Sequence, residues 1–181
     1  RQKILDFYHL GYESHSTDFQ TDADLKALVE DNFFILKVGP WLTFAYREAL
    51  FALENMEIEI LGKDFQGLSN LREILEKVMI NQPKYWERYY QGDEKQRFFK
   101  RKYSFSDRLR YYWPMEELNN AKDRLFRNLR ENKIPYSLLS QFMPLQFYQV
   151  CEGSISVDPQ ELVHSYIRNV TGIYSMACGL S

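Results

Sequence analysis

The sequence predicts a parallel α/β fold that continues into a long helical region. Two observations support this prediction. Strand and helix patterns alternate over the first 61 residues, as they do in βα units with a parallel sheet. From Gly62 onward the strand patterns stop, and only helical periodicity with turn residues follows. We therefore divide the chain into an α/β part, residues 1–61, and a mostly helical C-terminal region, residues 62–181.

The first strand is expected over residues 11–15. Residues 1–10 have the pattern of a helix end, and Gly11 suits the position that follows a helix C-terminus. The strand becomes polar at its C-terminal end. Thr21 can cap the next helix, because its hydroxyl can accept a hydrogen bond from a free backbone N–H group of the first turn.

The second strand is expected over residues 33–38, with the sequence "FFILKV". A nearly continuous apolar run of this length is typical of a parallel strand covered on both faces. Gly39 and Pro40 end it, and residues 41–61 then form a long amphipathic helix. Two strands are too few for a stable parallel sheet. Because the sequence also starts within a helical pattern and without Met, we expect it to be the C-terminal part of a longer chain.

Capping residues and prolines divide the helical region. Asp158, with Pro159 and Glu161 after it, is a strong helix start. Pro144 separates two short helices, and Ser104 or Ser106 can cap a further one. The helices expected here cover residues 68–80, 83–90, 107–113, 115–130, two segments within 134–150, and 158–177.

Composition excludes several classes of protein. The net charge of −2 does not favour binding to nucleic acid or to an anionic membrane, and no apolar run approaches the ~18 residues of a membrane span. Cys151 and Cys178 fit neither a zinc motif nor a disulfide framework, which favours a reducing, cytoplasmic location.

Residues 98–114 mix Arg and Lys with aromatic residues, and we interpret them as a helical interface or an intrachain packing element.

Polar residues gather at the end of the first strand, in "YESHSTDFQTD". Side chains alternate along a strand, so Glu13 and His15 share one face. In an eight-stranded α/β barrel that face would point into the barrel mouth, where active sites lie, with Asp18 on the loop above. Glu13 and His15 could then act in acid–base chemistry or bind a metal ion. Alternatively, they form a structural polar layer, and residues 16–18 hold the turn.

Lys37 and Gly39 lie at the end of the second strand. Lys37 could bind a sugar phosphate together with the Gly39 loop, or it could pair with Glu13 on the neighbouring strand. The alternative is a structural ion pair and a simple turn. Neither of the glycine-rich loops that bind nucleotide phosphates occurs in the sequence, which does not support a kinase of those classes. His15 and Glu13 are also too few for a catalytic zinc site, which typically has three protein ligands.

Long, uncommon motifs across the whole chain resemble one family. These are "YESHSTDFQT" and "FFILKVGPWLTFAYREALFALENME", followed in order by "PKYWERYYQGD", "KYSFSDRLRYYWP" and "IPYSLLSQFMPLQF". They are similar to the C-terminal portion of the non-catalytic subunit of class II D-tagatose-1,6-bisphosphate aldolase, a family also labelled tagatose-6-phosphate kinase.

The resemblance implies that residues 1–61 are the last two βα units of a (β/α)8 TIM-type barrel. It implies an accessory subunit that supports the stability and activity of the aldolase in galactitol and N-acetylgalactosamine breakdown. The zinc ion and the catalytic groups would belong to the partner, the catalytic subunit, and no cofactor is expected in this chain. The alternative is a barrel enzyme that itself acts on a phosphorylated ketohexose, as an aldolase or a kinase. Glu13, His15, Asp18, Lys37 and Gly39 remain candidates for binding a phosphorylated sugar or, for the first two, a metal ion.

Overall fold

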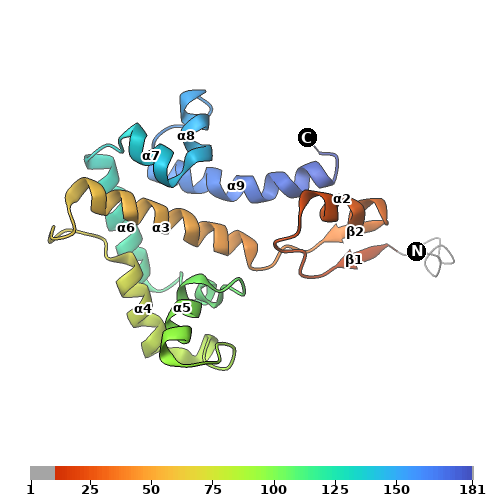
Figure 1. Cartoon of the computed structure of the whole chain (residues 1–181), viewed down its shortest axis with the longest axis horizontal. Helices are drawn as coiled ribbons and strands as arrows, with labels where there is room; N and C mark the ends of the chain where they lie inside the picture. Colours follow the sequence, from red (N-terminus) through yellow and green to blue (C-terminus); the bar gives the residue numbers. More distant parts are fainter. Residues whose placement is uncertain (1–10, 181) are drawn as a thin grey trace.

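The computed structural model describes residues 11–180, and most of them are helical (Figure 1). The helix end expected within residues 1–10 lies outside the described residues. The α/β part has the predicted order of two strands and two helices. Its elements are β1 (Tyr12–Ser14), α2 (Asp22–Glu30), β2 (Phe33–Leu36) and α3 (Trp41–Leu61).

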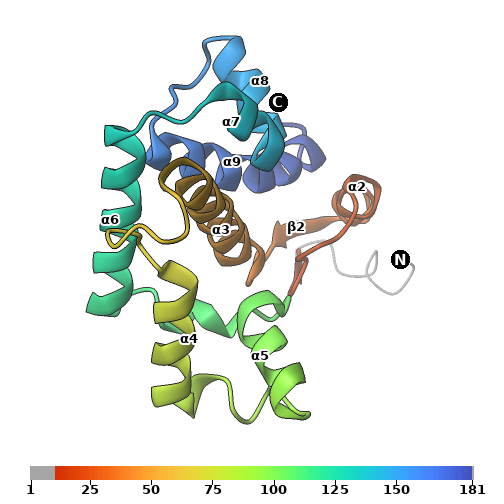
Figure 2. The ribbon, with the colours of Figure 1, turned by 60° about the vertical axis from the view of Figure 1, so that its left-hand side comes forward.

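The two strands pair in parallel, as predicted, and form a small sheet at one margin of the molecule (Figure 2). Tyr12 lies opposite Phe33 and Ser14 opposite Leu36, with an irregularity after Tyr12. The expectation that the second strand is covered on both faces is not met within residues 11–180. Phe34 is 74% exposed and Ile35 52% exposed.

Local capping explains where the first helices begin and end. The Thr21 hydroxyl accepts a hydrogen bond from the Asp24 N–H group, which confirms its predicted role at the start of α2. Helix α3 ends at Leu61, and Gly62 follows with φ of 81°, a backbone conformation that glycine adopts readily.

The C-terminal region contains six α-helices among the described residues. The long helix predicted over 115–130, the break at Pro144 and the start at Asp158 are all confirmed. The elements are α4 (Leu71–Asn81), α5 (Glu94–Tyr103), α6 (Glu116–Glu131), α7 (Tyr136–Phe142), α8 (Pro144–Cys151) and α9 (Pro159–Ala177), with 3-10 turns η1 (Pro83–Tyr85) and η2 (Arg108–Tyr111).

Three details of the prediction for residues 83–113 were wrong. The expected helices at 83–90 and 107–113 are short 3-10 turns. The second follows Asp107, whose φ of 39° is incompatible with a helix that continues from Ser104 or Ser106. Helix α5 was not predicted, although Asp93 and Gln96 form a complete capping box at its start.

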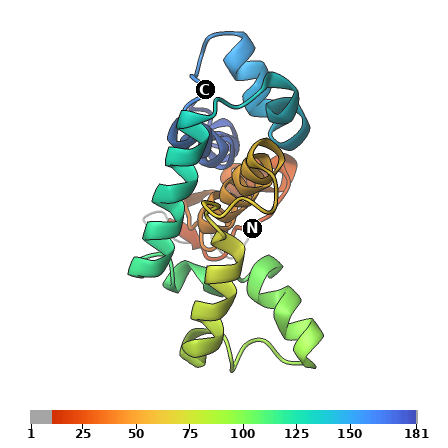
Figure 3. The same cartoon turned by 90° about the vertical axis from the view of Figure 1, so that its left-hand side faces the viewer.

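Helix α3 lies at the centre of the core. Helices α6, α7 and α9 pack against it, and Figures 1 and 3 show α3 and α9 side by side with α6 crossing them. Because α3 shares its core with the helices that follow, the division at residues 61 and 62 stays a prediction.

No helix within residues 11–180 combines the length and apolarity needed to cross a bilayer.

A buried polar network joins α3 to α6. The Glu57 carboxylate accepts hydrogen bonds from the Ser69 N–H group at 3.0 Å and from the Asn128 amide at 2.6 Å. Glu57 is fully buried. A buried carboxylate is tolerated only when such donors replace water, so this network fixes how the two helices meet.

Candidate functional site

Three charged or ionisable side chains meet where the strands end, and we call Glu13, His15 and Lys37 the strand-end cluster. Glu13 Oε1 lies 2.5 Å from Lys37 Nζ and 2.6 Å from His15 Nε2. This confirms that Glu13 and His15 share a face and that Lys37 pairs with Glu13 across neighbouring strands. All three side chains are accessible to solvent, with His15 70% exposed.

The ion pair determines the charge of Glu13. The hydrogen bond from Lys37 is the main cause that lowers the pKa of the Glu13 carboxyl, and the positive charge of Lys37 and the contact with His15 add to it. Glu13 therefore stays ionised across the neutral pH range. A general base works best when its pKa lies near the working pH, so the paired Glu13 is poorly tuned for that role.

Asp18 is bound to the start of helix α3. Its Oδ1 atom accepts hydrogen bonds from the N–H groups of Gly39 at 2.8 Å and Trp41 at 2.9 Å, on either side of Pro40, which has no N–H group. The carboxylate thus satisfies free donors of the helix N-terminus and interacts favourably with the helix dipole. Phosphate binding by the Gly39 loop stays a prediction, and the Gly39 N–H group is already bonded within the chain.

Gly39 is required by this close approach. A Cβ atom at position 39 would lie 2.7 Å from Asp18 Oδ2, closer than non-bonded atoms tolerate. Glycine removes the clash and allows the carboxylate to lie against the backbone.

Thr17 joins the strand-end loop to the last helix. It is buried, and its hydroxyl donates a hydrogen bond to the Lys37 carbonyl at 3.1 Å. The Tyr174 hydroxyl, on α9, donates to the Thr17 carbonyl at 2.9 Å. Thr17 therefore acts as the structural alternative expected, in which residues 16–18 hold the turn after the strand. Nothing in the local sequence indicated Tyr174 as its partner.

Aromatic side chains pack next to this loop. The rings of Phe19 and Phe105 are 4.5 Å apart, and each also contacts Phe44. Phe105 belongs to the basic and aromatic stretch at residues 98–114. Part of that stretch is therefore an intrachain packing element that connects the helical region to the strand ends.

The strand-end cluster does not fit a catalytic metal ion. It supplies one imidazole and one carboxylate, and the carboxylate is held by the Lys37 ammonium group. Within residues 11–180, no group of three or more His, Cys, Asp or Glu side chains is arranged to hold a metal ion. Typical catalytic zinc sites have three protein ligands. What the cluster offers chemically is a cation, an imidazole and a carboxylate at an exposed strand end.

Comparison with known proteins identifies the family. The sequence model of the family described as D-tagatose-1,6-bisphosphate aldolase subunit GatZ/KbaZ-like matches residues 1–179. The chain belongs to this family. The resemblance seen in the sequence motifs is thereby confirmed.

A solved structure supports both the family and the fold. The chain is similar to the crystal structure of a probable tagatose 6 phosphate kinase from Sinorhizobium meliloti 1021, with 36% sequence identity and a TM-score of 0.90. The match covers 98% of this chain and 45% of that one. The chain thus spans less than half of the length of the protein that it resembles.

Proposed function

We propose that this chain is the C-terminal portion of an accessory, non-catalytic subunit that supports a class II D-tagatose-1,6-bisphosphate aldolase. The observation that carries the proposal is the family match over residues 1–179. The pathway proposed is galactitol and N-acetylgalactosamine breakdown in the cytoplasm. The partner is the catalytic subunit, which would hold the zinc ion.

The chemistry of the strand ends agrees with an accessory role. Glu13 is paired with Lys37, and Asp18 is bonded to the start of α3, so both carboxylates have partners within the chain. A carboxylate held by an ammonium group is a weaker proton acceptor than a free one. We infer that the main role of these contacts is to hold the strand-end loops.

The proposal includes a (β/α)8 barrel, of which β1 and β2 would be the last two strands. Their parallel pairing and the alternating order of strands and helices support it. The exposed side chains of Phe34 and Ile35 would be covered in a complete barrel, because strands of parallel sheets are buried on both faces.

A coupled aldolase assay tests the accessory role. Cleavage of tagatose 1,6-bisphosphate is measured for the full-length protein alone, for the catalytic subunit alone and for the mixture. We expect no turnover by the full-length protein alone and a faster or longer-lived activity in the mixture. Equal activity and equal lifetime of the catalytic subunit with and without it would refute the proposal.

A second candidate is a barrel enzyme that acts on a phosphorylated ketohexose by itself, as an aldolase or a kinase. The observation in its favour is that a carboxylate, an imidazole and a lysine meet at the strand ends. It predicts turnover by the isolated full-length protein that Glu13→Gln or Lys37→Ala abolishes. The accessory role predicts that Glu13→Gln leaves activation of the partner unchanged.

Ligand binding by the strand-end cluster is tested separately from catalysis. Lys37 would pair with the phosphate of a phosphorylated sugar, and Glu13 with His15 would be the candidates for a metal ion. Calorimetric titration of the full-length protein with tagatose bisphosphate, and in a second experiment with zinc, measures both. The absence of binding heat for a ligand refutes this role of the cluster toward that ligand.

A further inference from the structure

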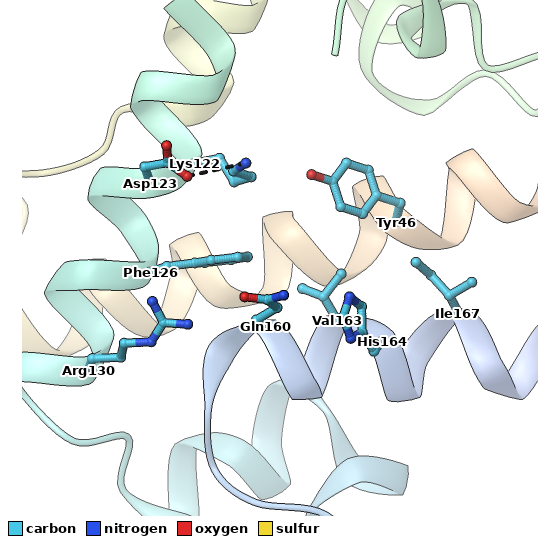
Figure 4. Close-up of a pocket in the computed structure, with 9 residues that line it drawn as sticks. All are labelled: Tyr46, Lys122, Asp123, Phe126, Arg130, Gln160, Val163, His164 and Ile167. Carbon is cyan, nitrogen blue, oxygen red and sulfur yellow. Dashed lines mark ion pairs between the residues drawn. The ribbon is translucent and has the colours of Figure 1, made fainter. Parts of the chain in front are cut away.

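A cavity of about 390 Å³ lies between α3, α6 and α9 and shares no residue with the strand-end cluster (Figure 4). Its volume falls in the range of pockets that bind small molecules. Helical spacing directs the side chains into it. Helix α6 contributes Lys122, Phe126 and Arg130 at intervals of four residues, so they lie along one face.

One side of the cavity is apolar. Phe126 from α6 and Val163 and Ile167 from α9 line it. Tyr46 from α3 contributes its ring, which is held by an edge-on contact with Trp113 at 5.0 Å between ring centres. A ligand can therefore bury an apolar or ring-shaped part against this side.

The polar side of the cavity has unused hydrogen-bond donors. Among residues 11–180, no partner bonds to the Tyr46 hydroxyl, the Gln160 side-chain amide or the His164 ring. Arg130 uses Nε and Nη2 for Asp158 on the start of α9, which leaves its Nη1 group without a bond to a described residue. In Figure 4 the Tyr46 hydroxyl points toward Lys122 across the cavity.

Lys122 completes this set of donors. Its Nζ lies 3.2 Å from Asp123 Oδ1 and donates a hydrogen bond to Asn119 Oδ1 at 3.4 Å, which leaves one of the three donors of the ammonium group for an occupant. Burial is the main cause that raises the pKa of Tyr46, with Asp123 adding to it, so the phenol stays protonated and can donate. Asp123 lines the cavity and Asp158 pairs with Arg130, so an occupant's acceptors would be held by the free donors of Lys122, Arg130 and Tyr46 and not by an excess of positive charge.

We propose that the α3–α6–α9 cavity binds a small organic anion, with an oxyanion head group toward Lys122, Arg130 and Tyr46 and an apolar body against Phe126 and the α9 wall. Phosphate and carboxylate head groups share this chemistry, because both accept several hydrogen bonds from cationic and hydroxyl donors. The site goes beyond the proposed function and does not depend on it.

Calorimetry with simple probes tests the class of ligand. Phenyl phosphate and benzoate, titrated in turn into the full-length protein, distinguish the two head groups. Inorganic phosphate lacks the apolar body and benzyl alcohol lacks the charge. We expect saturable binding of at least one aromatic anion, with a dissociation constant on the order of 1 mM or lower, and at least about tenfold weaker binding of the two reduced probes. Absence of binding by both aromatic anions, or equally tight binding of a reduced probe, overturns the proposal.

Variants locate the binding. Lys122→Met should weaken it about tenfold or more, and Tyr46→Phe by about threefold to tenfold. His164→Ala, at an exposed position, should weaken it without a risk to folding. Lys26→Met is the matched control, because Lys26 also faces a carboxylate on its own helix but lines no described cavity. Unchanged affinity in the three cavity variants, or an equal loss in the control, would assign the binding elsewhere and overturn the proposal.

Discussion

Replacing Asp18 by alanine removes the carboxylate that accepts two hydrogen bonds at the start of α3. The Gly39 and Trp41 N–H groups would each lose an acceptor within 2.9 Å, and the helix N-terminus would lose a nearby negative charge. Loss of a helix cap costs about 0.5–2 kcal/mol. Because Asp18 satisfies two donors and carries a charge, we expect a loss near the upper end, about 2 kcal/mol. Asp18→Asn retains an acceptor oxygen and should cost about 1 kcal/mol.

Urea unfolding measures this difference. The midpoint should fall for both Asp18 variants while the denaturant dependence stays constant, because the surface exposed on unfolding does not change. Asp64→Ala, at an exposed loop position, is the control and should change stability by less than about 0.5 kcal/mol. If Asp18→Ala is as stable as this control, the Asp18 contacts do not stabilise α3 and the reasoning is wrong.

Three further predictions concern the strand ends and the core. In Lys37→Met, the pKa of Glu13 should rise toward its ordinary value in an NMR titration. In the wild type, this ion pair stabilises the fold at pH values above the unfolded-state pKa of Glu13, and the stabilisation is lost as pH falls through the lowered folded-state pKa. We expect this stabilisation to be smaller in the variant. An unchanged pKa of Glu13 would contradict the pairing. Thr17→Val should lower stability by about 1 kcal/mol in urea unfolding, because the Lys37 carbonyl loses its hydroxyl donor and keeps only the N–H group of residue 17; wild-type stability would contradict this. Glu57→Ala should cost about 3 kcal/mol or more by thermal unfolding, because the Asn128 amide and a loop N–H group lose their acceptor; a loss below about 1 kcal/mol would contradict the network.

The sequence predicted helix boundaries correctly where a residue acts on the backbone of its own segment. Thr21 and Asp158 cap helices by bonding to residues two or three positions away, and Pro144 starts a helix that its ring suits. Helix α5 escaped prediction because its sequence is mostly charged and shows little apolar periodicity. Arg101 on this helix is buried through ion pairs with Glu76 and Glu94, and the first of these partners is 25 residues away.

The strand-end cluster could be predicted because its geometry follows from strand alternation and parallel pairing. Alternation along a strand places Glu13 and His15 on one face, and parallel strands bring Lys37 beside them. The contacts of Asp18 with the start of α3 and of Thr17 with α9 depend on loop conformation and on helix packing. Neither of these follows from local spacing, so the sequence offered a turn-holding role for residues 16–18 only as an alternative, and the partners of Asp18 and Thr17 were found only in the structure.

The contact between Thr17 and Tyr174 has a consequence for synthesis. Helix α9 packs against both α2 and α3, and it is made about 120 residues after the strands. While the ribosome is still adding the middle of the chain, the strand-end loop lacks the Tyr174 hydroxyl as a partner, and the apolar side chains of α2 and α3 are not yet covered by α9. The strand-end loop is therefore completed only after α9 has been made. Its protection from premature association depends on how quickly translation reaches Tyr174.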